Sequence, residues 1–391
     1  MAREAEFDVA VVGAGPGGSN AVAVALRGGL RVAQIERHKF PRVKPCAGGL
    51  TVKSLNALQF DLQPAIRYAA TSFEFNSWNG RKRHYSRGLP MIRMVYRPEF
   101  DNHLVDQNRH RPGFTFFDNE MVLDARYAGG AFRIQTENRT LTSRQLIAAD
   151  GAYSPLNRQF AVANPKGAAV AIETNIPRSD VQTAQDPTTC FDFGVIRQGY
   201  GWIFPKNDHL SFGLYTFARG MKDLRRRLSD YVALKDVALR PGAHFHFQAH
   251  LIPVGGYRVN VPAVPLYVVG DAGGFADALT GEGIYHALES GRLAGEAACR
   301  VHRGHGSHHW YYRRLWKAVL PDTFLTYVVS RWFYRDPGSR LGLLERSLIW
   351  RPLMQGLAQG ATFTKSIARS GQYLVESSFG SGVRLLDLGS G

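Results

Sequence analysis

The chain has 391 residues, of which 45% are hydrophobic and 20% are charged, which is typical of a globular protein with a sizeable core and excludes a disordered chain. No apolar run approaches the roughly 18 residues of a membrane span, and no charged-then-apolar leader is visible, so we expect neither a transmembrane nor a secreted protein. The formal net charge of +16 favours anionic partners: a dinucleotide, a phosphate-bearing substrate, nucleic acid or an anionic bilayer.

The first predicted unit is a strand, a tight turn, a helix and a second strand. The apolar run "FDVAVVGAG" ends in glycines, a helix-like segment follows, and "RVAQIE" ends in Glu36. Gly13, Gly15 and Gly18 give GxGxxG in this context. Such glycines permit a tight turn, close approach of the backbone to a pyrophosphate and close helix packing, and a carboxylate at Glu36 can accept both ribose hydroxyls. We therefore predict a dinucleotide site rather than a purely structural glycine turn.

A basic loop, "FPRVKPCAGGL" (residues 40–50), follows the second strand. Two cations, Arg42 and Lys44, precede Cys46 in this loop, and two glycines follow it. The cations would lower the pKa of a nearby thiol. The alternative is a small apolar residue in a turn. Cys46, Cys190 and Cys299 are the three cysteines, and none has a partner at metal-ligand or disulfide-framework spacing. We expect no metal and a reducing, cytoplasmic location.

The middle of the chain is rich in alternating, strand-like patterns, which predict a sheet-based substrate domain. From about residue 291 onward the pattern becomes helical. The predicted strands are "TSFEFNSW" (71–78), "KRHYS" (82–86), "AAVAIETNI" (168–176), "TCFDFGVI" (189–196), "GWIFP" (201–205) and "LSFGLYTF" (210–217).

A second glycine-rich segment lies at residues 266–297, where an apolar strand leads to Asp271 and a loop with Gly281 and Gly283 opens a helix. An Asp at a strand end can hold a polyol hydroxyl, and the free N–H groups of a helix N-terminus can stabilise negative charge on a ring carbonyl. These are the requirements of FAD, which has a ribityl chain and a reducible ring as well as an adenosine end.

The glycine motif with Glu36, "ADGAYS" (149–154) and "VVGDAGG" (268–274) together resemble the p-hydroxybenzoate hydroxylase type of flavoprotein. Within that group, "PRVKPCAGG" (41–49) and "GYGWIFP" (199–205) resemble the geranylgeranyl reductase family of FAD-dependent oxidoreductases. The resemblance covers roughly residues 5–300. It implies an α/β (α+β) fold in which a Rossmann-type FAD-binding domain is interleaved with a β-sheet substrate domain, plus a helical C-terminal region.

The domain boundaries follow from this fold. We expect the FAD-binding domain at 1–70, 95–165 and 255–300, the β-sheet substrate domain at 71–94 and 166–254, and the helical region at 301–391.

The resemblance also implies individual cofactor contacts. Arg97 matches an arginine that holds FAD, Val122 a backbone position near the adenine, and Cys46 a flavin-proximal cysteine that could act as the catalytic proton donor. The full predicted cofactor set is Gly13, Ala14, Gly15, Gly18, Glu36, Arg37, Cys46, Ala47, Gly48, Gly49, Arg97, Val122, Asp271, Gly281, Gly283 and Ile284.

One departure from the family pattern and one aromatic pattern bear on the site. Family members usually have a proline where this chain has Asp277-Ala278, which puts the rigidity of the loop that faces the flavin in question. Tyr200, Trp202 and Phe204 alternate and so share one face of a strand. Such a face is often core, but the match to the family favours the lining of an apolar substrate cavity.

The predicted activity is saturation of carbon–carbon double bonds in a polyprenyl or similar apolar substrate by hydride from reduced FAD. No second GxGxxG unit is visible, so the electron donor would be NAD(P)H visiting transiently, ferredoxin or free reduced flavin. Alternatives are a flavin-dependent monooxygenase or halogenase, whose "WxWxIP" is close to "YGWIFP", and a non-catalytic flavin-bearing isoprenoid or lipid carrier. A monomer is compatible with the sequence.

Two polar features lie outside these motifs. "HFHFQAH", which contains His244, His246 and His250, has no acidic or cysteine partner for a metal, so we expect a solvated or packed strand. Arginines interleave with aromatic residues in the helical tail, which suits peripheral contact with an anionic membrane at its inner face. No nucleic-acid motif accompanies them, so we expect no nucleic-acid partner.

Overall fold

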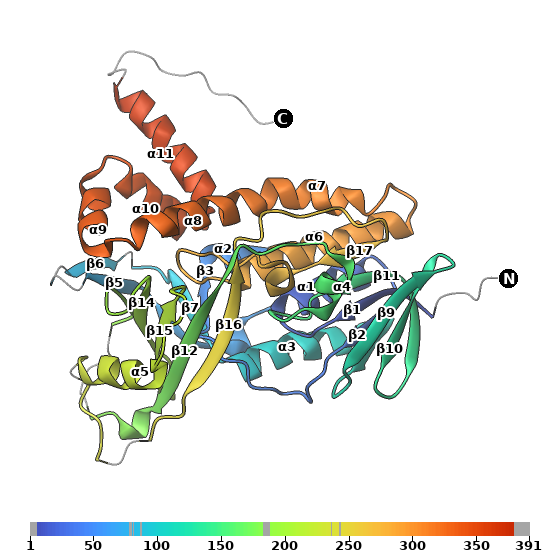
Figure 1. The fold of residues 1–391 in the computed structure, drawn as a ribbon, viewed down its shortest axis with the longest axis horizontal. Coiled ribbons are helices and arrows are strands. Elements are labelled where there is room, and N and C mark those ends of the chain that lie inside the picture. The colour runs from blue at the N-terminus through green and yellow to red at the C-terminus, as the bar shows by residue number, and fades with distance from the viewer. Residues whose placement is uncertain are drawn as a thin grey trace.

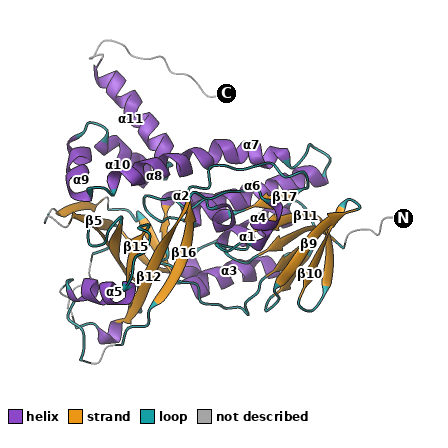
Figure 2. Cartoon of the chain, viewed as in Figure 1, coloured by secondary structure: helices purple, strands orange, loops and turns teal. Residues whose placement is uncertain are grey.

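The computed structural model describes residues 6–77, 80, 82–86, 88–182, 188–235, 237–241 and 244–378. The last 13 residues of the predicted helical region lie outside these ranges, and the side chains are described as far as residue 371. Figures 1 and 2 show a mixed α/β molecule in which helices α6 to α8 run along one side of two large sheets. The predicted fold class is confirmed.

The first sheet carries the nucleotide-binding unit. Its strand order is β8-β2-β1-β11-β10-β9, with β17 paired to β11, and the pairs among β8, β2, β1, β11 and β17 are parallel. The strands are β1 (Phe7–Val12), β2 (Val32–Ile35), β8 (Phe114–Phe117), β9 (Val122–Ala128), β10 (Ala131–Thr136), β11 (Thr140–Ala148) and β17 (Leu266–Val268). Because β1 and β17 are buried on both faces, they are apolar without alternation, apart from Asp8 near the start of β1.

Helices cover this sheet and bring distant segments together. Helix α1 (Pro16–Arg27) packs on α6 (Ile284–His302) so closely that a Cβ on Gly291 would lie 2.1 Å from the carbonyl oxygen of Gly17. The two glycine-rich segments therefore lie side by side, although more than 250 residues separate them. The other helices of this region are α2 (Val52–Ala57), α3 (Arg97–Arg109) and α4 (Pro155–Phe160).

The second large sheet is mostly antiparallel, in the order β16-β12-β15-β14-β13-β5-β6. It contains β5 (Ser72–Ser77), β6 (Lys82–Ser86), β12 (Gly167–Pro177), β13 (Cys190–Phe193), β14 (Gly199–Pro205), β15 (His209–Thr216) and β16 (Gln248–Val254), and α5 (Leu224–Ala233) packs on one face. These strands come from the two segments predicted for the substrate domain.

A three-stranded sheet, β3-β7-β4, joins the two large sheets. Its strands are β3 (Gly49–Thr51), β4 (Ile66–Ala70) and β7 (Ile92–Val95), so the expected boundary at residue 94 falls inside β7. The sequence patterns did not indicate β3, because only three residues pair and the strand begins at Gly49, which the resemblance to the family assigns to the cofactor-binding loop.

The C-terminal region is helical throughout its described part, as Figure 1 shows in orange and red. Its helices are α7 (His309–Ala318), α8 (Leu320–Phe333), α9 (Pro337–Arg346), α10 (Trp350–Ala358) and α11 (Phe363–Ser378). Helices α8 to α10 contribute Phe333, Leu341 and Trp350 to the same apolar cluster as the aromatic residues of β14. No helix of the described residues is long and apolar enough to cross a bilayer.

Candidate active site

The GxGxxG segment forms the turn between β1 and α1. Gly13 has a φ of +105°, and a Cβ there would lie 2.1 Å from the carbonyl oxygen of Ala149. A Cβ on Gly18 would lie 2.1 Å from the carbonyl oxygen of Gly13, so both positions require glycine. A Cβ on Gly15 would meet only Nη2 of Arg42, at 3.7 Å. Packing therefore closes the turn at two glycines, while the third leaves its backbone open to a ligand.

Glu36 lies buried just after β2, beside this turn. Its Oε2 accepts a hydrogen bond from the N–H of Ala14 at 2.9 Å, and its Oε1 accepts one from the N–H of His38 at 3.1 Å. The Nε of Arg42 lies 3.5 Å from the same Oε1. Arg37, the next residue along the chain, is exposed. The carboxylate is thus held in one orientation at the end of the strand, where a ribose acceptor is needed.

The basic loop at residues 40–50 runs from β2 to β3. Gly48 has a φ of +74°, and a Cβ there would lie 2.1 Å from the carbonyl oxygen of Val95. A Cβ on Gly49 would lie 2.8 Å from the ring of Phe204. The glycine pair therefore lets the loop touch the three-stranded sheet on one side and the aromatic face of β14 on the other.

Cys46 is held by a buried acid and a buried cation. Its N–H donates to Oε1 of Glu173 at 2.9 Å, and its thiol is hydrogen-bonded with Arg97. Arg97, the first residue of α3, makes two hydrogen bonds to Asp101, of 2.8 and 2.7 Å. Burial alone would lower the pKa of Arg97, but Asp101 and Cys46 raise it. The guanidinium therefore stays charged beside the thiol.

The second glycine-rich segment faces the first across the site. Lys44 Nζ lies 3.4 Å from Oδ2 of Asp271, which links the basic loop to this segment. A Cβ on Gly283 would lie 3.3 Å from Oδ1 of Asp271. Gly281 has a φ of +72°, and Ile284 begins α6 and is buried. The N-terminus of α6 and the carboxylate of Asp271 thus lie at one place, as the sequence predicts.

The loop at residues 277–283 is fixed from outside by three tyrosines. Each tyrosine hydroxyl donates to one of three consecutive backbone carbonyls, and Oδ1 of Asp277 accepts from two N–H groups within the loop. The donor and acceptor pairs are Tyr215 with Ala278 (3.0 Å), Tyr334 with Leu279 (2.6 Å) and Tyr200 with Thr280. These bonds hold the loop although the proline usual in the family is absent.

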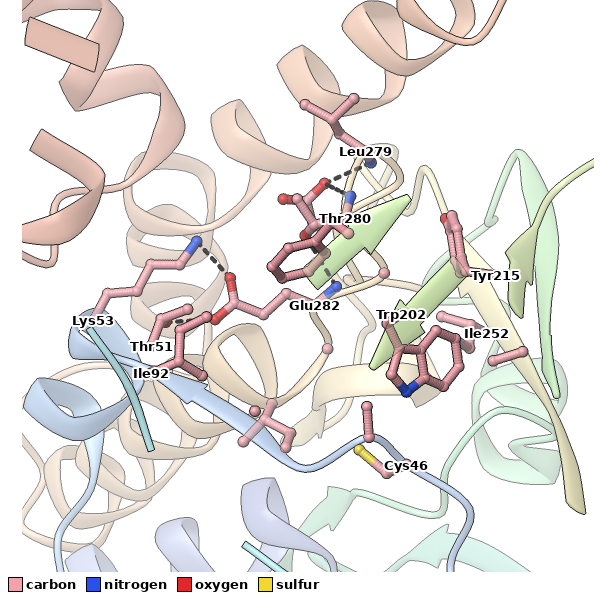
Figure 3. Close-up of a pocket in the computed structure, with 18 of the residues that line it drawn as sticks. Cys46, Thr51, Lys53, Ile92, Trp202, Tyr215, Ile252, Leu279, Thr280 and Glu282 are labelled. Atoms are coloured by element: carbon pink, nitrogen blue, oxygen red, sulfur yellow. Dashed lines mark hydrogen bonds and ion pairs between the residues drawn. The ribbon is translucent and has the colours of Figure 1, made fainter. Parts of the chain in front are cut away.

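An ion pair that sequence reasoning missed supports the same loop (Figure 3). Lys53 Nζ lies 2.9 Å from Oε2 of Glu282, and Oε1 of Glu282 accepts from the hydroxyls of Thr51 at 2.6 Å and Ser54 at 3.2 Å. Burial alone would raise the pKa of Glu282, but Lys53 lowers it. The acid is therefore ionised and anchors the loop to α2. Because Lys53 and Glu282 lie far apart in the sequence, the sequence did not indicate that they pair.

A cavity of about 570 Å³ connects all these parts. Gly15, Cys46 and Asp271 lie at one end, and side chains of α8 to α11 close the other. Its apolar far wall consists of Phe73, Phe75, Phe191, Phe193, Trp332, Phe333, Leu341, Leu344, Ile349, Trp350, Leu353, Met354, Leu357, Phe363 and Ile367. One cavity therefore joins the predicted cofactor region to an apolar chamber.

The aromatic face of β14 forms the wall between these ends. Tyr200, Trp202 and Phe204 are all buried and all line the cavity. The indole of Trp202 lies on Gly213 of β15, where a Cβ would come 2.0 Å from Cζ2, and its Nε1 donates to Oγ of Ser211 at 3.3 Å. The absence of a side chain at Gly213 thus sets the position of the indole.

Most of the predicted site residues meet in this cavity. Gly13 and Ala14 belong to the turn between β1 and α1, and Glu36 lies beside it, but none of the three lines the cavity. Arg37 is exposed, and Val122 begins β9. The contacts of these five residues with a cofactor remain predictions. The predicted residues that line the cavity are Gly15, Gly18, Cys46, Ala47, Gly48, Gly49, Arg97, Tyr200, Trp202, Phe204, Asp271, Gly281, Gly283 and Ile284.

Glu173 and His250 are two further polar lining residues that were not predicted as site residues. Glu173 is buried, its Oε2 has no hydrogen-bond partner among the described residues, and burial raises its pKa. His250 lies in β16, and burial, followed by the charge of Lys44, lowers its pKa to about 4. The sequence predicts an ordinary solvated or packed strand here. His250 does belong to a strand, but it also lines the cavity. Only the pairing of β12 with β16 brings these two residues to the cavity, and neither stands in a recognisable motif.

The arrangement fits FAD. The open backbone at Gly15 suits a pyrophosphate, Glu36 suits the adenosine ribose, and Asp271 with the N-terminus of α6 suits the ribityl chain and ring. Among the described residues, no cluster of three or more histidine, cysteine or acidic side chains could hold a metal ion.

Sequence comparisons agree with this assignment. The model of the FAD-binding-domain family matches residues 6–207, which is about half of the chain. The chain is 32% identical over 365 residues to an uncharacterised protein of Methanosarcina barkeri, with 93% of each chain covered. It is 31% identical to a menaquinone reductase of Mycobacterium tuberculosis, covering 83% of this chain and 82% of the relative. It is 26% identical to the chloroplastic geranylgeranyl diphosphate reductase of Arabidopsis thaliana, covering 86% and 76%.

The chain belongs to the FAD-binding-domain family of flavoproteins, and its relatives include geranylgeranyl reductases at low identity. Solved structures of similar fold include a geranylgeranyl bacteriochlorophyll reductase-like protein of Thermoplasma acidophilum, with a TM-score of 0.76, 20% identity and coverage of 93% and 95%. The flavin-dependent brominase Bmp2 has a TM-score of 0.69 at 18% identity, with coverage of 96% and 100%. At these identities the structural matches establish the fold of this flavoprotein and not its substrate.

Proposed function

We propose that this flavoprotein reduces carbon–carbon double bonds in a polyprenyl or similarly apolar chain. The observation that carries the proposal is the shape of the main cavity, which leads from Cys46 and Asp271 to a chamber walled by aromatic and aliphatic side chains. The whole cavity, cofactor end included, has a volume of about 570 Å³, which is in the range of ligand-binding pockets. Relatives named as reductases of geranylgeranyl diphosphate and menaquinone support the same reaction type.

The side chains of the chamber would position the alkene and exclude water. Trp202, clamped on Gly213, and Phe204, packed on Gly49, offer flat apolar surfaces beside the cofactor region. The N-terminus of α6 and Lys44 would favour negative charge on the reduced ring. When bound, reduced FAD supplies the hydride that adds to one alkene carbon.

Cys46 would supply the proton that the other alkene carbon requires. Its backbone is fixed by Glu173, its thiol contacts Arg97, and it lines the cavity where the cofactor and apolar regions meet. Glu173 could return a proton afterwards, because its raised pKa keeps it protonated more often than an exposed glutamate. General acid groups of this kind contribute roughly 10²–10⁴-fold to a rate.

The test is anaerobic turnover with chemically reduced FAD, combined with mass spectrometry of lipid extracted from the purified protein. We expect a prenyl chain to co-purify and to gain two hydrogen atoms for each flavin that is oxidised. Cys46→Ala should retain FAD and slow reduction by roughly 10²-fold. Cys190→Ala is the control, because that thiol is buried outside the cavity. An unchanged rate in Cys46→Ala would remove the proton-donor role.

Oxygen separates this reaction from the monooxygenase and halogenase alternative, which shares the fold with the brominase. Turnover without oxygen excludes that alternative, and an absolute need for oxygen would exclude the reductase. A non-catalytic lipid carrier would bind the chain but leave reduced flavin unoxidised under every condition.

The electron donor belongs to the proposal as well. NAD(P)H visiting transiently, ferredoxin or free reduced flavin would each fit a chain in which we see no second GxGxxG motif. Stopped-flow reduction of the bound flavin by each donor in turn identifies it.

Contact with an anionic membrane would bring an apolar substrate to the chamber. Trp316, Phe324, Val328 and Trp332 are exposed on α7 and α8, where Lys317 and Arg331 lie between them in the sequence, and Trp332 also lines the cavity. Basic-aromatic helical surfaces bind anionic interfaces. Co-sedimentation with phosphatidylglycerol vesicles at low salt should exceed that with phosphatidylcholine vesicles, and equal sedimentation would count against it.

A further inference from the structure

A second cavity, of about 540 Å³, lies on the other side of the loop that faces the active site. We call it the basic cavity, because its lining includes Lys166, Arg197, Arg219, Arg331 and Arg335 and no aspartate or glutamate. Its floor is buried and consists of Val254, Ala278 and Ser330. Ala278 belongs to loop 277–283, whose neighbouring residues Asp277 and Leu279 line the main cavity.

The five cations converge from separate parts of the chain. Lys166 precedes β12, Arg197 precedes β14, Arg219 follows β15, and Arg331 and Arg335 lie at the carboxyl end of α8. The negative end of the α8 dipole accounts for a cation in its last turn. It does not account for the three cations that the sheet brings to the same cavity.

None of these cations has an acidic partner within ion-pair distance in the described part of the chain. The side-chain contacts found are a hydrogen bond from Nη2 of Arg197 to the carbonyl oxygen of Arg219, at 3.3 Å, and the guanidinium of Arg331 over the ring of Tyr327, at 6.0 Å. Elsewhere, arginines such as Arg292 and Arg97 pair with one or two carboxylates. Five uncompensated like charges around one cavity repel each other, and a bound anion would remove that repulsion.

The walls behind the cations are firmly packed. Gly255 has a φ of +72°, and a Cβ there would lie 2.9 Å from the ring of Tyr327 and 3.1 Å from Cβ of Lys166. The N–H of Lys166 donates to the carbonyl oxygen of Val254 at 3.1 Å, and the carbonyl oxygen of Arg197 accepts from the hydroxyl of Thr216 at 2.7 Å. The bases of the basic side chains are thus fixed, while their ends reach solvent at the cavity mouth.

We propose that the basic cavity is a binding site for a phosphate-bearing anion with at least two negative charges, separate from the FAD site. Arginine forks suit phosphate oxygens, and cations beside four elements can surround a diphosphate group. The ligand could be a phosphorylated nucleotide or the head group of a prenyl diphosphate; both present the same chemistry to the site. Because loop 277–283 separates the two cavities, occupancy on one side contacts the loop that the active site uses on the other.

The experiment is isothermal titration calorimetry of inorganic pyrophosphate into the FAD-loaded protein at low salt, so that the cofactor's own phosphate site is filled. We expect saturable one-site binding that weakens as NaCl is added. Arg331→Gln/Arg335→Gln should weaken binding by about 10-fold or more, as expected for lost charge-assisted hydrogen bonds. Arg197→Gln/Arg219→Gln, which changes a different element, should do the same.

The matched control is Arg133→Gln/Arg313→Gln, which removes the same charge from exposed positions outside the basic cavity. Its affinity should stay within about 2-fold of the wild type. No saturable binding by the wild type, or equal affinity in all four proteins, would overturn the proposal. Melting temperatures of the FAD-loaded variants verify that each is folded before titration.

Competition then separates the two sources of the anion. Displacement of pyrophosphate by NADPH and not by farnesyl diphosphate assigns the site to a nucleotide, and the reverse assigns it to a substrate head group. Because pyrophosphate binding requires no turnover, the site can be confirmed or rejected whether or not the proposed reductase reaction is correct.

Discussion

At the cofactor end of the main cavity the wall is made by glycine backbone, whereas at the substrate end it is made by aromatic side chains. Gly13, Gly18 and Gly48 each have another backbone carbonyl oxygen 2.1 Å from where a Cβ would lie. At the substrate end, Tyr200, Trp202 and Phe204 project from one strand toward side chains of α8 to α10. Backbone geometry tolerates almost no substitution, while an apolar chamber tolerates changes that conserve volume.

This difference explains how one scaffold can carry related flavoproteins with different substrates. The cofactor end depends on a few short segments whose conformation glycine dictates. The substrate end depends on the packing of a sheet against a helical region, which can be remodelled without moving the glycines. Mutations at the cofactor end should therefore impair FAD binding, whereas mutations at the substrate end should impair turnover of the substrate and leave FAD bound.

The largest effect is expected at the buried ion pair of Lys53 with Glu282, which anchors loop 277–283. Lys53→Met leaves Glu282 without its ion-pair partner, and breaking such a buried pair costs about 3–5 kcal/mol of unfolding free energy. Chemical denaturation of the apo and FAD-loaded proteins measures this. Lys365→Met, at an exposed lysine on α11, should change stability by less than about 0.5 kcal/mol.

The Lys53 effect should also depend on pH. Lys53 lowers the pKa of Glu282 in the folded protein, so the contribution of the pair is complete above the ordinary glutamate pKa of about 4.3. It is lost as the pH falls through the lowered folded value. The stability difference between wild type and Lys53→Met should accordingly shrink below about pH 4. A difference that is constant from neutral to acidic pH would contradict this.

At the cofactor end, Gly13→Ala should abolish FAD binding and lower the unfolding free energy by about 2–4 kcal/mol. The cause is a strained φ of +105° together with a backbone clash at 2.1 Å. Flavin absorbance after gel filtration and thermal unfolding report the two effects. Gly29→Ala is the matched control, because Gly29 also has a positive φ but open space around it, and it should cost about 1 kcal/mol and retain FAD.

At the substrate end, Gly213→Ala should displace the indole of Trp202, from which a Cβ would lie 2.0 Å. We expect a loss of about 1–3 kcal/mol in stability, full FAD content and a clear fall in turnover of the apolar substrate. Gly167→Ala, where a Cβ meets only a Val254 methyl at 3.9 Å, is the control on the same sheet. Loss of FAD in Gly213→Ala would show that the two ends are not separable.

The smallest effect is expected at the tyrosines that hold loop 277–283. Tyr334→Phe removes one hydrogen bond, to the carbonyl oxygen of Leu279, and should cost about 1 kcal/mol. Faster amide exchange within the loop, with FAD retained, would identify the tyrosines as the substitute for the missing proline. Tyr153→Phe, at an exposed tyrosine, should leave exchange in the loop unchanged.

Local geometry explains why the sequence predicts so much of the cofactor end. A turn that needs a positive φ or a close backbone contact requires glycine, so Gly13, Gly18 and Gly48 stand out in the printed sequence. Glu36 and Asp271 can also be recognised locally, because each comes just after a predicted apolar strand. Resemblance to the family then indicates the basic loop and the aromatic strand.

Several features required the tertiary structure. Glu173 and His250 reach the cavity because β12 pairs with β16, the Lys53 and Glu282 pair joins residues 229 positions apart, and α8 brings Arg331 and Arg335 to cations of the second sheet. Chain folding alone decides such contacts, since no local pattern records which charged or aromatic side chains will meet. The sequence by itself determined an FAD-binding α/β protein with a glycine-built cofactor end, because backbone conformation is a local property. The structure decided the shape of the chamber, the support of the loop and the basic cavity, because these depend on packing between distant segments.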